Sequence, residues 1–220
     1  MFGALDESLR DVSVQAIPIV FGITLHEVAH GWMARRYGDR TAEMLGRLSF
    51  NPLRHLDPIG TVVVPLVSTL LAGIPFGWAK PVPVNPRAMR TPRQAMIAVA
   101  LAGPGANFVM AFAWALSLYV ANELAGVLPA VATFWVAVAS FGIHFNVFLA
   151  VFNLLPFPPL DGSRVLRECL GPGGARQLDA IEPYGLILVF GLLYFGALNF
   201  LTLPLQFIQG LILKLTGLVP

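Results

Sequence analysis

An apolar stretch at residues 14–34 carries ionisable side chains in the order His26-Glu27-Val28-Ala29-His30. If the stretch is a helix, His26 and His30 lie one turn apart on the same face, about 6 Å along the axis. Two neutral imidazoles at this spacing can bind one zinc ion, and Glu27 beside them can accept a proton from water. The alternative, a packed histidine pair with a solvated glutamate, is disfavoured because an ionisable group in an apolar helix is costly without a partner. The pattern therefore predicts a zinc site on a helix within an apolar layer.

The composition indicates that this apolar layer is a membrane. Of the 220 residues, 56% are hydrophobic and 12% are charged, and the mean hydropathy is +0.73. A soluble domain carries about 25% charged residues. The pI of 9.0 reflects a net charge of only +2, which favours basic loops beside a membrane and argues against nucleic-acid binding. A single cysteine, Cys169, excludes an internal disulfide framework and a zinc site built from cysteines.

Three segments are predicted to cross the bilayer, at about residues 12–37, 94–123 and 131–155, each long enough for a crossing of ~20 residues. The acidic N-terminal residues argue against a cleavable signal peptide, so the first span is expected to act as its own insertion signal. The last apolar run, residues 184–215, is too long for one crossing and contains Asn199 and Pro204. We expect a helical hairpin there, at about residues 183–216.

The segment between the first two spans is harder to assign. Residues 46–58 have the composition of short strands and turns, and the prolines of residues 80–86 favour an extended chain. Residues 59–78 are apolar but broken by proline and glycine, so they either cross the bilayer or re-enter on the same side. The expected fold is an all-α polytopic membrane protein with about five to six transmembrane helices and a re-entrant or short β-strand segment. We expect one membrane-embedded domain, residues 1–220, with its core at about residues 12–165.

Charge predicts the orientation. Of the 14 lysines and arginines, 12 lie at positions 35–93 or 164–176, whereas the short link between the second and third spans holds Glu123 and no basic residue. If residues 59–78 are re-entrant, both basic stretches face one side, which the positive-inside rule makes cytoplasmic. We therefore expect a multi-pass protein of a prokaryotic plasma membrane, with the histidine pair towards the cytoplasm.

Two histidines do not complete a catalytic zinc site, because three protein ligands and a water are usual. The candidates for the third ligand are His144, Glu123 and Asp161. Glu123 falls at the end of its span that lacks basic residues, on the wrong side. Asp161 follows a helix end broken by three prolines, on the same side as His30, where a carboxylate can face inward. A turn aspartate in Leu-Asp-Gly remains the alternative for Asp161.

The motif His26-Glu27-x-x-His30, followed by Asn153-x-x-Pro156-x-x-x-x-Asp161-Gly162, resembles the site-2 protease family of intramembrane zinc metallopeptidases. Gly103-Pro104-x-x-Asn107 is similar to the middle core helix of that family, and the resemblance covers about residues 21–165. It implies one Zn²⁺ bound by His26, His30 and Asp161, with Glu27 as the catalytic carboxylate. Asn153 matches the asparagine of the family that positions substrate or stabilises an oxyanion. The chain has no room for the PDZ or CBS domains of many relatives, and therefore resembles a minimal form.

The implied activity is cleavage of transmembrane protein substrates in the lipid bilayer, as in regulated intramembrane proteolysis or the clearance of signal-peptide remnants. Asn153 could donate a hydrogen bond to the oxyanion or join two helices, and Asn146 lies on nearly the same face. Asn107 is interpreted as a packing residue, His144 as structural and His55 as a loop residue, with a second metal at His55 as a minor alternative.

A helical substrate must be held extended, and residues 78–85 offer an edge for β-addition, unless they form a plain proline-rich connector. Two other classes remain open. A metal transporter or sensor could use the same histidines and aspartate, but it has no need of Glu27. A membrane metalloprotease acting on soluble chains usually takes a glutamate as third ligand, and Glu168 and Glu182 have poorer contexts than Asp161.

Overall fold

The computed structural model describes residues 2–72 and 77–219, and within them the chain is helical, without β-strands. The α-helices are α1 (Phe2–Arg36), α2 (Thr41–Met44), α3 (Val64–Ala72), α4 (Pro92–Leu124), α5 (Pro129–Asn153), α6 (Asp161–Cys169), α7 (Pro172–Ile181), α8 (Gly185–Tyr194) and α9 (Thr202–Leu215). Short 3₁₀ turns cover Pro52–Arg54, Pro86–Ala88, Glu182–Tyr184 and Ala197–Leu201, and a π-helical turn covers Pro58–Val63. In this described part, four helical stretches are long and apolar enough to cross a membrane: Arg10–Arg36, Pro92–Leu124, Pro129–Asn153 and Ala197–Leu215.

The three predicted core spans agree with the stretches Arg10–Arg36, Pro92–Leu124 and Pro129–Asn153 to within two residues at each end, although helix α1 itself begins earlier, at Phe2. Prolines at the first helical position, Pro92 and Pro129, begin α4 and α5, where their missing N–H costs no hydrogen bond. The last apolar run breaks at Phe195 and Gly196, where Gly196 has φ +65°, and Asn199 lies in the 3₁₀ turn that follows. Helix α8 has 10 residues, about 15 Å in length, whereas a bilayer core is about 30 Å thick. Of the two arms of the expected hairpin, α9 with its preceding turn is therefore the one long enough to cross.

The prediction of short strands at residues 46–58 is wrong. The structure has turns and the 3₁₀ helix Pro52–Arg54 there, capped by the Asn51 side chain, which accepts from the Leu53 amide at 3.0 Å. Asparagine and proline favour such a local turn over a strand ladder. Residues 59–78 begin as the π-helical turn and α3, but residues 73–76 lie outside the described residues. Whether this run re-enters or crosses stays a prediction.

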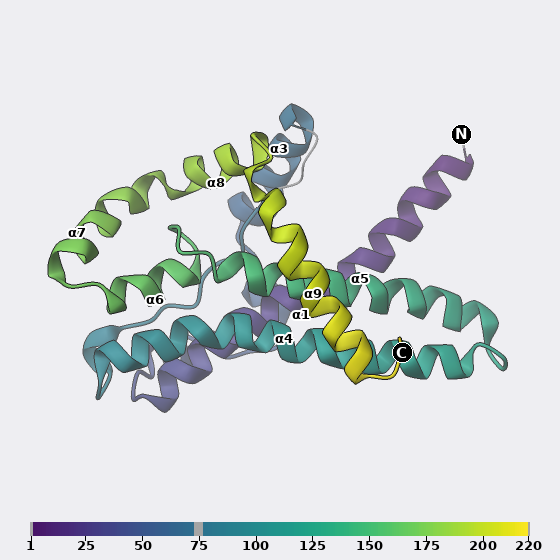
Figure 1. The fold of residues 1–220 in the computed structure, drawn as a ribbon, viewed down its shortest axis with the longest axis horizontal. Coiled ribbons are helices and arrows are strands. Elements are labelled where there is room, and N and C mark those ends of the chain that lie inside the picture. Colours follow the sequence, from purple (N-terminus) through teal and green to yellow (C-terminus); the bar gives the residue numbers. More distant parts are fainter. Residues whose placement is uncertain (1, 73–76, 220) are drawn as a thin grey trace.

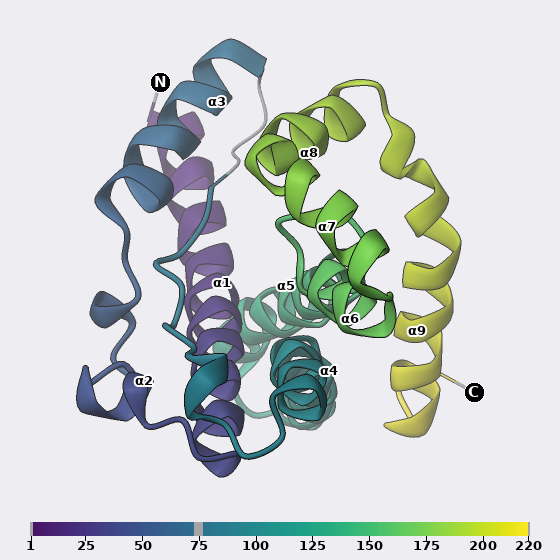
Figure 2. The same cartoon turned by 90° about the vertical axis from the view of Figure 1, so that its left-hand side faces the viewer.

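Helices α4 and α5 lie antiparallel and side by side, and α1 packs against both (Figures 1 and 2). Helix α9 crosses over them on another side, where Ile212 joins a core of Ala111, Ala115, Ile143 and Val147. Small residues let these helices approach closely, as is usual between membrane helices. The bundle thus brings the middle and end of α1 into contact with α4 and α5.

The C-terminal end of α1, the start of α4 and helix α6 lie at one end of the molecule, and the α4–α5 connection lies at the other (Figure 1). The first end carries Arg35 and Arg36 of α1, Arg93 of α4, and Arg164 and Arg167 of α6. The fold thus places these separate basic stretches together.

Candidate metal centre

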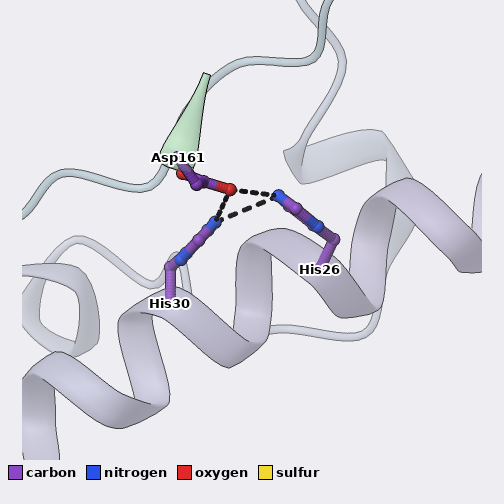
Figure 3. Close-up of side chains that lie close together, drawn as sticks. All are labelled: His26, His30 and Asp161. Carbon is purple, nitrogen blue, oxygen red and sulfur yellow. Dashed lines mark hydrogen bonds and ion pairs between the residues drawn. The ribbon is translucent and has the colours of Figure 1, made fainter. Parts of the chain in front are cut away.

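Three buried side chains meet where α1 faces the start of α6. His26, His30 and Asp161 are 7%, 5% and 6% exposed. Their side chains point toward one another (Figure 3): the two Nε2 atoms are 3.0 Å apart, and Asp161 Oδ2 lies 3.1 Å from His26 Nε2 and 3.2 Å from His30 Nε2. The helical spacing of the two histidines and the proline-broken approach to Asp161 thus bring the three predicted ligands together. Among the described residues, this is the group that could hold a metal ion.

The other ring nitrogen of each histidine is held by α4. His26 Nδ1 lies 2.6 Å from Asn107 Oδ1, and His30 Nδ1 lies 2.7 Å from the carbonyl oxygen of Val99. Both partners are acceptors, so each Nδ1 carries the proton and donates it. The amide orientation of Asn107 is fixed in turn, because its Nδ2 donates to Gly22 O at 3.1 Å and to Asn146 Oδ1 at 2.9 Å. This arrangement leaves the lone pair of each Nε2 facing the centre of the group.

The three converging atoms are therefore acceptors, with two imidazole lone pairs and a carboxylate oxygen about 3 Å apart. Asp161 Oδ2 is buried and receives no conventional hydrogen bond. Such a cluster is unfavourable unless a cation lies between the three atoms. Two neutral imidazoles and one carboxylate are a donor set for zinc, with a fourth position left for water or substrate. The residues therefore fit the predicted Zn²⁺ on their own geometry.

Gly103 of α4 lies directly against both imidazole rings. A Cβ atom at this position would be 2.6 Å from Cε1 of His26 and 2.6 Å from Cε1 of His30. Only glycine allows the backbone of α4 to approach the rings so closely. The element Gly103-Pro104-x-x-Asn107 thus contributes both a close approach and a hydrogen-bond acceptor to the site, and the interpretation of Asn107 as packing alone was incomplete.

Glu27 and Asn153 line the same cavity of about 400 Å³ as the three converging side chains. Glu27 Oε2 accepts a hydrogen bond of 2.8 Å from the backbone N–H of Val82. Asn153 is the last residue of α5, and its Nδ2 donates to Leu149 O at 2.9 Å, within its own helix. The observed bond of Asn153 is therefore within α5, whereas a bond between two helices was one of the two alternatives for this residue.

The approach to Asp161 depends on a tight backbone turn. Helix α5 ends at Asn153 and α6 begins at Asp161, and a Cβ atom on Gly162 would lie 2.5 Å from the carbonyl oxygen of Leu155. Ser163 closes the turn by donating its hydroxyl to Leu160 O at 2.6 Å. Arg164, one helical turn on, lines the cavity with its Nη1 3.8 Å from Asp161 Oδ1. Asp161 and Gly162 are the first two residues of α6, and the close backbone approach at Gly162 therefore determines where the Asp161 carboxylate lies.

The two other histidines lie outside this group. His55 is 2% exposed, and its Nε2 lies 2.8 Å from Ser49 O. His144 is exposed on α5, and its Nδ1 lies 2.9 Å from the side-chain nitrogen of Gln209 on α9. Neither joins a cluster of three possible ligands in the described part of the chain.

A carboxylate beside two histidines and an aspartate is the arrangement of a hydrolytic zinc centre, and here it lies among helices long enough to cross a membrane. Fold and site together define a membrane zinc metallopeptidase. The model described as "Peptidase family M50" matches residues 119–192, which include Asn153 and Asp161.

Two bacterial relatives agree over most of the chain. The Bacillus subtilis protein named "Putative zinc metalloprotease YwhC" is 40% identical over 172 residues, covering 78% of this chain and 75% of its own length. Rip2 of Mycolicibacterium smegmatis, with the same description, is 36% identical over 181 residues, covering 82% of this chain and 66% of its own. No solved structure matches the chain. The chain belongs to peptidase family M50 and is a zinc metalloendopeptidase, which confirms the resemblance drawn from the sequence.

Proposed function

We propose that this peptidase hydrolyses peptide bonds in or next to the transmembrane segments of other membrane proteins. The observation that carries the proposal is the position of the acceptor cluster, buried between helices of which α1 and α4 are each long enough to span a bilayer. A peptide bond reaching this site must enter from the membrane or its edge. The charge distribution supports a site facing the cytoplasm of a prokaryotic cell, since the basic ends of α1, α4 and α6 lie together (Figure 1).

In the proposed mechanism His26, His30 and Asp161 hold the zinc ion. When bound, zinc lowers the pKa of a water molecule and polarises the scissile carbonyl. Glu27 accepts the proton through Oε1, because the Val82 amide occupies Oε2. The water oxygen adds to the carbonyl carbon, the C–N bond breaks, and Glu27 returns the proton to the leaving nitrogen. The Asn153 amide, which lines the cavity, donates in this mechanism to the carbonyl oxygen as negative charge develops there.

The substrate must leave its helical conformation, because helical amides are already hydrogen-bonded. Trp78, Ala79 and Val82 of the extended segment line the cavity. This supports the idea that a substrate strand adds along the segment, pairing with its backbone.

The test uses Glu27→Gln, which keeps the shape of the side chain but has no basic carboxylate. In liposomes with a single-span substrate, cleavage is expected to fall by about 10²–10⁴-fold with zinc content unchanged. Glu43→Gln is the matched control, since Glu43 pairs with Arg35 and Arg40 at the surface. Wild-type cleavage by zinc-loaded Glu27→Gln would refute the mechanism, and cleavage of soluble but not membrane-spanning chains would refute the substrate class.

The metal ligands are tested in the same preparations. Asp161→Ala is expected to lose both zinc and cleavage, whereas His144→Ala keeps one zinc per chain. The opposite result would show that the third ligand is wrongly assigned. A metal transporter would need further ligands along a path, and in residues 2–72 and 77–219 the candidate group is the single one at His26, His30 and Asp161.

A further inference from the structure

The extended segment Trp78–Asn85, here called the strap, is bound to the rest of the molecule through four of its backbone amides. The bonds run from Trp78 N–H to Gly60 O (3.0 Å), Lys80 N–H to His55 O (2.9 Å), Val82 N–H to Glu27 Oε2 (2.8 Å) and Asn85 N–H to Asp39 Oδ2 (2.6 Å). Prolines occupy positions 81 and 83 between these donors and offer no N–H of their own. Three of the four acceptors lie between α1 and α3, on Asp39, His55 and Gly60. The fourth is the carboxylate of Glu27.

One arginine side chain joins the strap to the loop that precedes it. The guanidinium of Arg47 donates to Arg54 O on the loop, and on the strap to Lys80 O at 2.6 Å and Pro81 O at 3.4 Å. The C=O of Pro81 and the N–H of Val82 belong to one peptide group, and the C=O of Lys80, which receives the shorter bond, belongs to the peptide group before it. Arg47 therefore holds the planar peptide group next to the one that donates to Glu27, and contacts the donating group itself through the longer bond to Pro81 O.

Leu48 of the preceding loop and Val82 of the strap also pack closely against α1, next to the metal ligands. A Cβ atom on Gly31, which follows His30, would lie 2.6 Å from Leu48 Cδ2 and 2.8 Å from Val82 Cγ1. With glycine at that position the strap lies close against the turn of α1 that carries Glu27. The position of the strap relative to α1 thus depends on the close approach at Gly31 and on the hydrogen bonds from Arg47.

A glutamate side chain has several rotatable bonds, and a general base must be held within reach of the proton that it takes. One oxygen of Glu27 is fixed by the Val82 amide, which leaves Oε1 for the reaction. We propose that Arg47 is a positioning residue for Glu27 that acts through the backbone amide of Val82. This inference rests on the proposed role of Glu27 as the base, and nothing in the side chain of Arg47 needs to touch substrate or metal.

The experiment removes the Val82 N–H without altering any side chain, by replacing the amide with an ester through incorporation of the corresponding α-hydroxy acid. The Val82 ester and Arg47→Ala are each expected to lower kcat by about 10–10²-fold, since small displacements of a catalytic group have effects of this size. Zinc content and KM should stay near the wild-type values. Arg47→Lys keeps one charged hydrogen-bond donor for the strap but lacks the planar guanidinium with its several N–H groups. It should therefore recover part of the kcat that Arg47→Ala loses.

Two matched controls are available. An ester at Ala88 removes a backbone N–H that is bonded to Asn85 O beyond the strap, away from the base, and Arg54→Ala removes a neighbouring arginine that donates to Gly46 O. Both should keep the wild-type kcat. Combining Arg47→Ala with the Val82 ester gives the decisive measurement, because residues acting through one contact are not additive. The double variant should be no slower than the slower single variant.

The outcomes separate this inference from the proposed function. Cleavage by the wild-type enzyme and its loss in Glu27→Gln report on the function alone. With that established, a Val82 ester of wild-type kcat overturns the inference. Fully multiplicative losses in the double variant also overturn it, as does a loss of zinc in Arg47→Ala that accounts for its lost turnover. Lowered kcat at constant zinc and KM, with non-additivity, supports it.

Discussion

Replacing Gly103 by alanine should damage the metal centre from outside the ligand set. The added Cβ would lie 2.6 Å from Cε1 of His26 and of His30, whereas ordinary contacts begin at 3.4 Å. Each ring, or the backbone of α4, must therefore give way by about 0.8 Å to restore an ordinary contact. Neither ring can swing freely, because His26 is held by Asn107 and His30 by Val99 O.

A movement of this size exceeds the tolerance of a metal site, in which ligand distances vary by about 0.2 Å. We expect zinc affinity to fall by about 10–100-fold, the range seen when groups that orient metal ligands are lost. Overpacking adds a stability cost of about 1–3 kcal/mol. Gly105→Ala is the matched control, because a Cβ atom at position 105 meets nothing within 4 Å.

The assay is competition for zinc against a chelator of known affinity, with thermal unfolding of the metal-free and zinc-loaded forms in detergent. Gly103→Ala should lose affinity while Gly105→Ala matches the wild type. If Gly103→Ala binds zinc with wild-type affinity, then the rings are not the rigid neighbours that the structure indicates, and the argument from close approach is refuted.

Asn107→Ala removes the acceptor that fixes His26 Nδ1, so zinc affinity should fall by about 10–100-fold in the same chelator assay; an unchanged affinity would contradict a role in orienting His26. Cys169, exposed on α6, should react with a membrane-impermeant maleimide in inverted vesicles and not in intact cells, and labelling only from outside would overturn the proposed orientation. For Asp39, burial raises the pKa, but hydrogen bonds from the Asn85 amide and from Thr41 outweigh it and hold the pKa below its usual value. The stabilisation by this carboxylate is therefore complete above the unfolded pKa of about 3.9 and is lost as the pH falls through the folded pKa. Asp39→Asn should flatten the acid limb of a plot of melting temperature against pH, and an unchanged acid limb would contradict this assignment.

The sequence predicted the parts of the site that depend on local geometry. His26, Glu27 and His30 lie within one and a half turns of one helix, so their relation is set by helical periodicity alone. Asp161 could be proposed because the prolines before it end a helix on the expected side, and because the motif resembles a known family. The structure brings its Oδ2 to within 3.2 Å of both histidines.

The contacts made by α4 could not be predicted in this way. Val99 is 69 residues from His30 in sequence, and Asn107 is 81 residues from His26. Which carbonyl or amide of α4 meets each ring depends on how far α4 slides and rotates against α1, and periodicity does not specify this. The contact between the Val82 amide and Glu27 was missed for a similar reason, because a backbone donor has no identity in the sequence.

Glycine and asparagine together determine how the three core helices fit around the metal site. Asn107 joins α1 to α5, since it contacts His26, Gly22 O and Asn146, and Asn146 donates to Gly142 O at 2.9 Å. The bonds of Asn107 to Gly22 O and to Asn146 require α1, α4 and α5 to lie close together, and a Cβ atom on Gly22 would lie 2.8 Å from Phe145 and 3.2 Å from Asn146 Oδ1. Buried amides in an apolar bundle are stable only when their partners stay in place. A substitution at Gly22 would therefore act on the orientation of His26 through Asn146 and Asn107, at a distance from the site, and the packing of α1 against α5 becomes part of how the zinc ligands are held.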